Sequence, residues 1–289
     1  MWRLTGFLYL LSGLLWASEP PIRAWNQMLD HPNPIVMMLL QRALELTEPE
    51  FGPYKLERSM DMEQGRAIRA LQSGDIDIAV FAPNAERERT LLAIPVPIAK
   101  GLLGWRVCLI RPDTAARFST ISSLAEWQES GLRIGQLQTW PDTALLRSNG
   151  LKVEETAMYG NLFKMLLKGR FDCFLRSVIE VEDELSKHPE LIIEPHLVFR
   201  YPLPLLYFVS PARPELARRI ELGLQRAHEG GDYDRFFTEG LGGMIRRLGL
   251  ARRTVIELHN PELSPALRRV IDAPEFSYQV PAVDKINRE

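Results

Sequence analysis

The sequence predicts an α/β protein with two lobes of similar construction. Two observations support this prediction. Short β-branched runs alternate with amphipathic helical segments in the first third of the chain, and the same alternation begins again after a stretch rich in proline and glycine. Alternation of this kind is typical of a parallel sheet covered by helices. With 289 residues, 46% of them hydrophobic, the chain is long enough to give each lobe its own core.

Residues 75–104 are the stretch around which we expect both lobes to be organised. The apolar run 76–81 predicts a buried strand, which ends where a proline interrupts the ladder. Polar residues follow, Asn84 and Arg87 among them, and ligands bind beyond the carboxyl ends of strands in open α/β sheets. We therefore expect a binding edge here, followed by a crossing to the second lobe through residues 95–104.

Apolar periodicity and breaker residues predict the other elements. In the first lobe we expect further strands at residues 21–25 and 54–57, and helices at 36–44 and 62–73. In the second lobe we expect strands at 105–111, 132–137, 152–156, 171–175, 191–193 and 203–209, and helices near 123 and at 141–148, 162–168 and 179–186. Two more helices are expected at 215–228 and 233–238, and a short apolar run at 254–258.

These elements divide the chain into four segments. They are a signal peptide (1–18), the first part of lobe I (19–101), lobe II (102–210), and the second part of lobe I with a C-terminal tail (211–289). The boundary after residue 210 rests on Pro211 and Pro214, which we expect to mark the return crossing.

The first eighteen residues have the layout of a secretory signal peptide. Arg3 supplies a positive charge, residues 4–16 are apolar, and the small residues Ala17 and Ser18 follow. The alternative is a membrane anchor, but a spanning helix needs about 20 apolar residues. We therefore expect export, with cleavage near Ala17 or Ser18.

The two cysteines, Cys108 and Cys173, both fall in predicted strands. In an exported protein they would meet an oxidising compartment. A disulfide requires Cα atoms within about 7 Å, which a sequence does not reveal. We favour two buried thiols that pack as small hydrophobic groups, and leave the disulfide open.

Composition and the lack of certain motifs argue against several classes of function. The net charge is −2 and the basic residues are scattered, which argues against nucleic-acid binding. The five histidines and two cysteines lack metal-ligand spacing, so we expect no metal. A nucleophile elbow, a phosphate-binding loop and a dinucleotide fingerprint are also missing, and we expect neither a cofactor nor enzymatic activity.

Five short motifs follow one another along the chain: GDID at 74–77, NAER at 84–87, GQLQT at 135–139, KGRFD at 168–172 and PEL at 214–216. Their order resembles that of the bacterial extracellular solute-binding proteins of family 3, over roughly residues 24–237. The resemblance implies the type II periplasmic-binding fold, in which two α/β lobes joined by a hinge with two crossings hold a ligand between them. It also implies a periplasmic monomer that delivers a small solute to an ABC transporter permease or a membrane sensor.

Arg87 is the strongest candidate for a ligand-binding residue, because a guanidinium binds a carboxylate through two parallel hydrogen bonds. The resemblance places it in the family's Thr-x-x-Arg loop, with Asn84 at the threonine position. The alternative is a solvated arginine that pairs with Glu86 or Glu88.

Thr139 and Trp140 open a predicted helix, where backbone N–H groups bind anions. Trp140 is expected either to cover an apolar face of the ligand or to pack at the rim of the lobe. Asp142 is expected to cap the first turn.

Arg176 and Glu180 follow the predicted strand 171–175, four residues apart. Either Arg176 is a second anion clamp in the cleft, or the two form a surface salt bridge. Amino-acid binders of the family place an aspartate for the ligand's ammonium where this chain has Ser177. We therefore expect an anionic or carboxylate-bearing solute in place of an ordinary zwitterionic amino acid.

Two other functions stay open at this point. One is an enzyme on the same fold, such as a dehydratase, since a fold does not determine a function. Glu180 and Asp142 are its only nominees for a titratable group in the cleft. The other is an interaction module with a decayed cleft, which a cleft filled by side chains would favour.

Overall fold

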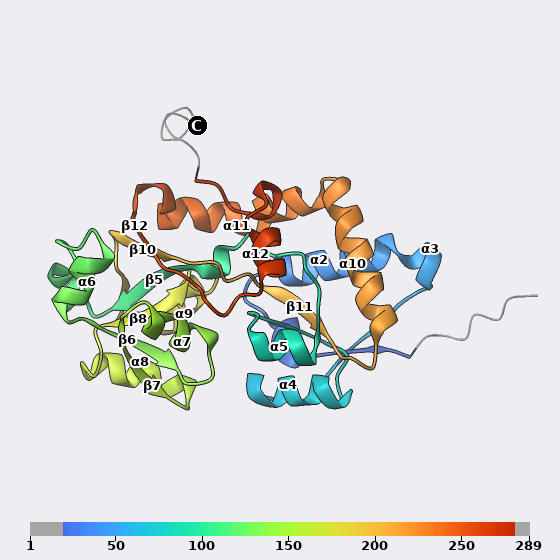
Figure 1. Cartoon of the computed structure of the whole chain (residues 1–289), viewed down its shortest axis with the longest axis horizontal. Helices are drawn as coiled ribbons and strands as arrows, with labels where there is room; N and C mark the ends of the chain where they lie inside the picture. The colour runs from blue at the N-terminus through green and yellow to red at the C-terminus, as the bar shows by residue number, and fades with distance from the viewer. Residues whose placement is uncertain (1–19, 281–289) are drawn as a thin grey trace, which may run out of the picture.

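The structure is a computed structural model that describes residues 20–280, and these residues form two α/β lobes (Figure 1). The expected signal peptide lies outside the described residues. In lobe I the strand order is β2-β1-β3-β11-β4. These strands are β1 (Ile22–Ala24), β2 (Leu56–Arg58), β3 (Ile78–Phe81), β4 (Leu92–Ala93) and β11 (Leu206–Val209). The helices of lobe I are α1 (Asn26–Leu29), α2 (Ile35–Leu46), α3 (Glu48–Phe51), α4 (Gln64–Ser73), α5 (Ala85–Thr90) and α10 (Pro214–Glu229).

In lobe II the strand order is β12-β10-β5-β8-β6-β7, and β9 also pairs with β5. The strands are β5 (Trp105–Ile110), β6 (Arg133–Leu137), β7 (Lys152–Thr156), β8 (Cys173–Ser177), β9 (Ile192–Ile193), β10 (Leu197–Arg200) and β12 (Thr254–Glu257). The helices are α6 (Leu124–Ser130), α7 (Pro141–Ser148), α8 (Tyr159–Leu167) and α9 (Val181–Lys187), with short 3₁₀ turns η1 (Leu102–Gly104) and η2 (Pro112–Arg117). The predicted α/β class with two lobes is confirmed.

The long helix α2 shows how the apolar pattern positions an element. The periodic residues Val36, Leu39, Leu40, Ala43 and Leu44 are all fully buried. They turn toward the lobe I core and toward α10, where Gly223 lies so close to Ala43 that an added Cβ would meet the Ala43 carbonyl oxygen at 2.1 Å. Glycine is therefore required for this helix–helix approach.

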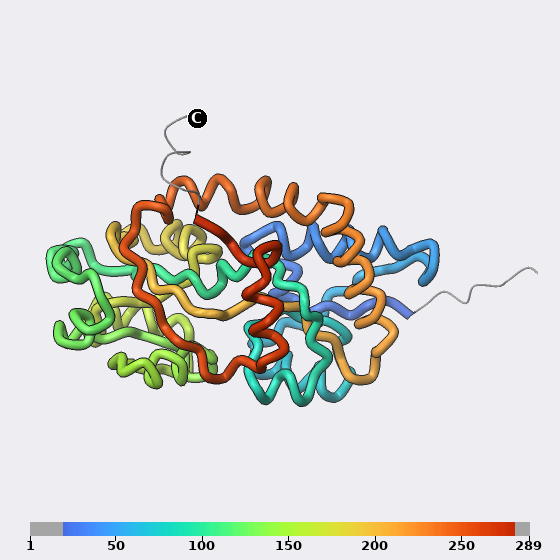
Figure 2. The backbone as a smooth tube through the Cα atoms, turned by 45° about the horizontal axis from the view of Figure 1, so that its top comes forward, coloured from blue at the N-terminus to red at the C-terminus, as the bar shows by residue number. Residues whose placement is uncertain are grey.

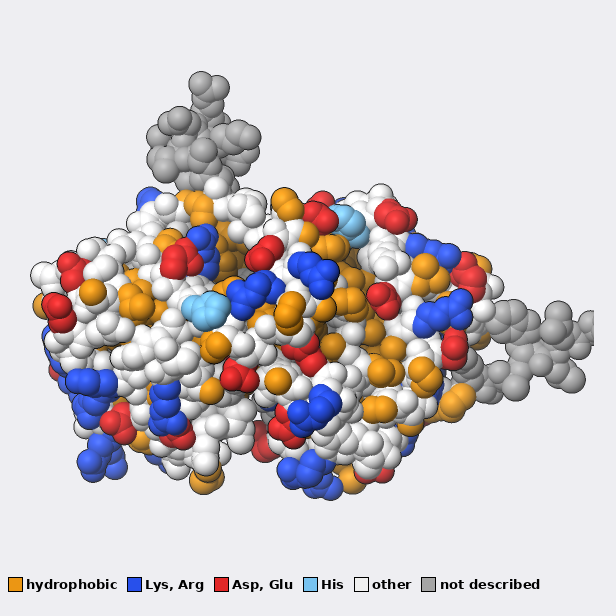
Figure 3. All heavy atoms as spheres, viewed as in Figure 1, with side chains coloured by type: hydrophobic (Ala, Val, Ile, Leu, Met, Phe, Trp, Pro, Cys, Tyr) orange, Lys and Arg blue, Asp and Glu red, His pale blue; other side chains and the backbone are white. Residues whose placement is uncertain are grey.

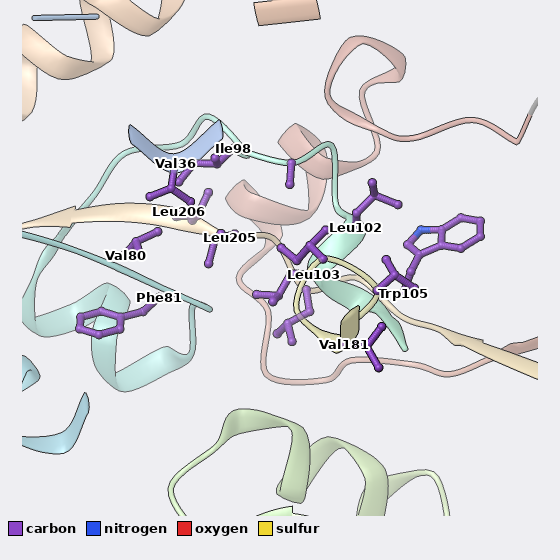
Figure 4. Close-up of a cluster of buried hydrophobic side chains, with 14 of the residues drawn as sticks. Val36, Val80, Phe81, Ile98, Leu102, Leu103, Trp105, Val181, Leu205 and Leu206 are labelled. Carbon is purple, nitrogen blue, oxygen red and sulfur yellow. The ribbon is translucent and has the colours of Figure 1, made fainter. Parts of the chain in front are cut away.

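The two crossings between the lobes lie side by side. Ile98 N donates to Leu205 O at 2.9 Å, and Tyr201 N donates to Gly104 O at 3.1 Å. A Cβ on Gly104 would meet Tyr201 O at 2.0 Å, so no larger residue fits where the crossings touch. Figure 4 shows the buried apolar side chains gathered around them, with Leu103 and Leu205 near the centre.

The return crossing lies earlier in the chain than expected. Residues 201–205 form it, and β11 then pairs antiparallel with β3 and β4 in the lobe I sheet. We had expected residues 203–209 to be a strand of lobe II and Pro211 to begin the crossing. The run is apolar throughout, and such a run fits the core of either sheet, so the sequence did not reveal its partner.

The C-terminal segment also departs from the expected division, because it returns to lobe II. The helix α11 (Asp232–Leu248) and the turn η3 (Leu250–Arg252) lead to β12, which pairs in parallel with β10. The chain then passes back over the crossings through α12 (Pro265–Ile271) and η4 (Pro274–Phe276), as Figure 2 shows in red. There, Asn260 Nδ2 donates to Pro202 O at 2.8 Å and Tyr278 N donates to Lys100 O at 2.8 Å. The expectation that residues 211–289 all accompany lobe I is therefore not met.

Cys108 and Cys173 form a disulfide, with their Cα atoms 5.0 Å apart. This corrects our preference for two buried thiols. The neighbouring strands β5 and β8 pair antiparallel with Cys108 opposite Leu175. This register brings Cys108 and Cys173 together as diagonal neighbours, a proximity that depends on strand pairing and not on either local sequence.

Replacing both cysteines, as Cys108→Ala/Cys173→Ala, should lower the free energy of unfolding by about 2–4 kcal/mol, because the disulfide restricts the unfolded chain. The bridged residues are 65 positions apart in the sequence. Urea unfolding of the two proteins measures the difference. When the unsubstituted protein is denatured without a reducing agent, thiol titration should detect no reactive thiol. Two titratable thiols per chain would contradict the pairing.

Candidate functional site

A cleft of about 500 Å³ lies between the two lobes and is lined by residues of both. The crossings contribute Leu103 and Leu205, and lobe I contributes the apolar residues Val80 and Phe81, all labelled in Figure 4. Residues that follow β3 and β6 also line it, as expected for ligand sites at the carboxyl ends of strands. The cleft is therefore an open cavity and is not filled by side chains.

Arg87 lies on the lobe I wall of this cleft and is only 4% exposed. Its guanidinium donates to Ala82 O at 2.6 Å and to Gln64 Oε1 at 3.1 Å, and lies 5.3 Å from the centre of the Phe81 ring. Within residues 20–280 it forms no ion pair, and Asp142 and Glu86 act on it only as more distant charges. Burial lowers the pKa of Arg87 to about 10, which leaves it charged at neutral pH. Arg87 is thus a buried cation held by neutral groups.

A second arginine, Arg106, lies near the start of β5 and lines the lobe II wall of the cleft. It was not among the residues expected from the sequence. Its Nη2 lies 2.7 Å from Asp142 Oδ1, and the Tyr201 hydroxyl donates to the same oxygen at 2.6 Å. All three side chains are buried. Burial alone would lower the pKa of Arg106, but the Asp142 carboxylate raises it above its usual value. This network joins β5, the first turn of α7 and the start of the return crossing. A single arginine inside an otherwise apolar strand was the available sequence signal.

Arg176 on β8 is neutralised by two glutamates. Its Nε donates to Glu184 at 2.6 and 2.8 Å, and its Nη2 lies 3.0 Å from Glu180 Oε2. The guanidinium also lies 4.4 Å from the centre of the Trp140 ring. Burial alone would raise the pKa of Glu180, but Arg176 and Arg106 lower it below its usual value, so Glu180 is ionised. The expected pair of Arg176 and Glu180 is present, but it lines the cleft, with Arg176 buried and Glu180 half-buried.

His31 lies in the loop after α1, lines the cleft, and is close enough to Glu180 of lobe II for that charge to act on it. Its Nδ1 accepts a hydrogen bond from Asn33 N at 3.1 Å, so the neutral ring carries its proton on Nε2. Burial lowers the pKa of His31, while the charge of Glu180 raises it by less. His31 is therefore neutral at pH 7.

The structure brings four of the six sequence-predicted site residues to the cleft: Arg87, Trp140, Arg176 and Glu180. Asn84 and Thr139 are not among the residues that line it. Asn84 caps α5, because its Oδ1 accepts from Arg87 N at 2.8 Å, and so it orients the helix that carries the arginine. Thr139 is exposed. The positions of the motifs indicated loops that border the cleft, but they could not tell which side chain of a loop points into it.

Other residues of the site left weaker signals in the sequence. Glu184 lies one helical turn after Glu180, so the two carboxylates share a face of α9, which was a readable pattern. Tyr159 and Phe163 share a face of α8 in the same way. In the described part of the chain, no group of histidine, cysteine, aspartate and glutamate side chains is arranged to hold a metal ion. No helix in residues 20–280 is long and apolar enough to cross a membrane.

The face shown in Figure 3 carries acidic and basic side chains interspersed, with no extended patch of one sign on that face. The charge that distinguishes this molecule is instead buried, at the arginines and carboxylates of the cleft.

Solved structures of amino-acid-binding proteins are similar to this chain. An ancestral arginine-binding protein bound to arginine is 18% identical, with a TM-score of 0.56 over 77% of this chain and 98% of that protein. An amino acid ABC transporter substrate-binding protein of Streptococcus pneumoniae, bound to L-arginine, is 16% identical, with a TM-score of 0.55 over 78% and 95%. The solute receptor for L-cysteine of Neisseria gonorrhoeae is 12% identical, with a TM-score of 0.53 over 78% and 92%. The chain has the fold of these binding proteins.

At these identities the likeness establishes the fold alone, and it confirms the two-lobed fold that the motif order implied. No protein-family model matches the sequence, and no curated protein matches it. The matched proteins are covered almost completely, whereas about a quarter of this chain lies outside the match.

Asp142→Asn should lower the free energy of unfolding by about 3 kcal/mol, because it removes the close partner of the buried Arg106 and leaves only Glu180, 3.9 Å away, as a counter-ion. The control is Asp113→Asn, whose carboxylate pairs with Arg111 at the surface with 69% of its side chain exposed. We expect it to change stability by less than about 0.5 kcal/mol. Urea unfolding checks both, and equal effects would contradict the buried network.

Proposed function

We propose that this protein is a periplasmic solute-binding protein whose two lobes close around a small carboxylate-bearing solute. The observation that carries the proposal is Arg87, a buried cation on one wall of the interlobe cleft that has no acidic partner among residues 20–280. A solute carboxylate would supply the missing counter-charge. Charge-assisted hydrogen bonds from a guanidinium to a carboxylate are strong and can form in parallel pairs.

The matched structures support this choice of chemical group. They name arginine and L-cysteine as ligands, and a further ancestral structure, 18% identical with a TM-score of 0.56, is bound to glutamine. Each of these molecules carries a carboxylate. A protein of the same fold with a buried arginine in its cleft is suited to the same group.

We infer further that the solute lacks a cationic group, which separates it from those amino acids. Among the carboxylates that line the cleft, Asp142, Glu180 and Glu184 all have arginine partners, whereas Asp30 and Glu63 are exposed to solvent. A ligand ammonium would have to compete with Arg106 or Arg176 for the first three. Burying an ammonium without an acceptor costs several kcal/mol.

Closure follows from the placement of these groups on different lobes. Arg87 belongs to lobe I, whereas Trp140 and the buried ion pairs belong to lobe II. A solute that contacts both walls binds the closed arrangement better than the open one, so it shifts the population toward closure. The closed complex would then be passed to an ABC permease or a membrane sensor.

The enzyme alternative rests on one matched structure, an ancestral amino acid-binding protein that is described as a precursor of cyclohexadienyl dehydratase. It is 16% identical, with a TM-score of 0.54 over 76% of this chain and 95% of that protein. A general acid or base needs a pKa near the working pH. The arginines instead lower the pKa of Glu180, and Asp142 is held by Arg106 and Tyr201. Binding is therefore the better supported function, and the open cavity argues against a decayed cleft.

Arg87→Ala should weaken binding of the solute by at least about 100-fold, because it removes two charge-assisted hydrogen bonds worth about 3 kcal/mol together. The solute is identified by native mass spectrometry of protein purified from its own envelope, and calorimetry with succinate, glutarate, acetate, L-glutamine and L-arginine tests the class. The control is Arg89→Ala, which removes an exposed arginine from the same helix. Unchanged binding in folded Arg87→Ala would contradict the proposal. Micromolar binding of L-glutamine would overturn only the exclusion of a cationic group.

Export of this protein is supported by the disulfide, since such bonds persist in oxidising compartments. N-terminal sequencing of protein recovered from the periplasm should begin within a few residues of Ser18. Recovery of chains that retain Met1, from a cytoplasmic fraction with reduced cysteines, would contradict the proposal.

A further inference from the structure

The guanidinium of Arg176 is enclosed by groups that would suit a bound cation. Trp140 lies 4.4 Å, Phe174 5.2 Å and Tyr159 5.7 Å from it, measured to the ring centres. Glu184 accepts two hydrogen bonds from its Nε, and Glu180 accepts one from Nη2. We call Trp140, Tyr159, Phe174, Glu180 and Glu184 the Arg176 cage.

The cage is itself braced. The Tyr159 hydroxyl donates to Glu184 Oε1 at 2.5 Å, and the Trp140 and Phe174 rings are nearly parallel, 6° apart. Cations bind over aromatic faces, and guanidinium groups combine such stacking with bidentate hydrogen bonds to carboxylates. Two carboxylates and three rings are more than a single structural arginine needs.

The other buried arginine of lobe II shows the difference. Arg106 pairs closely with one carboxylate, Asp142 at 2.7 Å, reaches Glu180 only at 3.9 Å, and its guanidinium lies 5.9 Å from the centre of one ring, Tyr201. That arrangement is sufficient for a buried ion pair that joins β5 to the first turn of α7. The cage instead surrounds one planar cation with rings and charge on several sides.

The cage opens on the cleft. Arg176, Trp140, Tyr159, Glu180 and Glu184 all line it. Tyr159 is 37% exposed and the Glu180 side chain 24% exposed, so the cage is a recess of the binding surface and not a sealed part of the core.

We propose that the Arg176 cage is a guanidinium-binding subsite of the cleft that the chain fills with its own arginine. Arg176 is then a specificity-determining residue: it occupies the place of a cationic side group and excludes solutes that bear one. This inference rests on the cleft being the solute site, as proposed above. The cage can nevertheless be tested without the native solute, because the probe is a simple cation.

The test removes the internal cation and supplies one from solution. In Arg176→Ala, Glu180 and Glu184 lose their shared partner, so the variant should be less stable than the wild type. Millimolar guanidinium chloride should raise its Tm with a saturable dependence, whereas it should not raise the Tm of the wild type. Sodium chloride at the same ionic strength controls for screening, and urea, of the same shape but neutral, controls for size.

A matched variant separates the cage from ion pairs in general. Arg117→Ala also removes an arginine from a carboxylate, Asp172, but the Arg117 side chain is 50% exposed. Guanidinium should not restore its stability. Restoration of both variants by guanidinium, or of Arg176→Ala by urea or sodium chloride to the same extent, would overturn the proposal.

Calorimetry extends the test to larger probes. Arg176→Ala should bind agmatine and L-arginine at least about tenfold more tightly than the wild type does. If Arg176→Ala does not fold in buffer, Arg176→Asn keeps a polar side chain that is too short to fill the cage and should show the same saturable guanidinium response. Absence of that response in a folded variant would refute the cage. Loss of carboxylate binding in Arg87→Ala does not depend on this outcome, so failure of the cage and failure of the proposed function can be told apart.

Discussion

The two lobes are connected where the two crossings touch, and the backbone contact there leaves no room for a side chain at Gly104. The backbone of Gly104 touches that of Tyr201, and this contact fixes where the chain leaves lobe I and where it returns. Just beyond it, Arg106 and the Tyr201 hydroxyl meet at Asp142, so a buried ion pair joins the crossings to the first turn of α7. The orientation of the lobe II wall therefore follows from the point at which the lobes are connected.

The cleft combines two kinds of buried charge. In lobe II the arginines and carboxylates form ion pairs with one another. The attraction within a buried pair exceeds the desolvation penalty of its two charges only when the geometry is good. On the lobe I wall of the cleft, Arg87 is held by a backbone carbonyl and an amide oxygen. A ligand anion gains most by meeting Arg87, which forms no ion pair within residues 20–280.

The C-terminal quarter adds connections that a two-crossing hinge does not require. At the first turn of α11, Asp232 meets Arg42 of α2 in lobe I at 2.5 Å. Near the end of the same helix, Arg247 meets Glu182 of α9 in lobe II at 2.5 Å. The chain then adds β12 to the lobe II sheet and crosses the hinge again before Tyr278 (Figure 2). Relative movement of the lobes must be accommodated by this segment as well as by the crossings.

Local sequence pattern predicted most of the elements and pointed to loops that border the interlobe cleft. Apolar periodicity was sufficient for α2, because burial of one helix face depends on local spacing. The order of short motifs was sufficient to predict the two-lobed fold. It also singled out the loops that carry Arg87, Trp140 and Arg176, three residues that line the cleft. Only the tertiary structure decided which sheet receives β11 and β12, because an apolar strand is compatible with several partners. The Cys108–Cys173 bond and the partners of each arginine were decided in the same way, since both depend on distances between strands far apart in the chain.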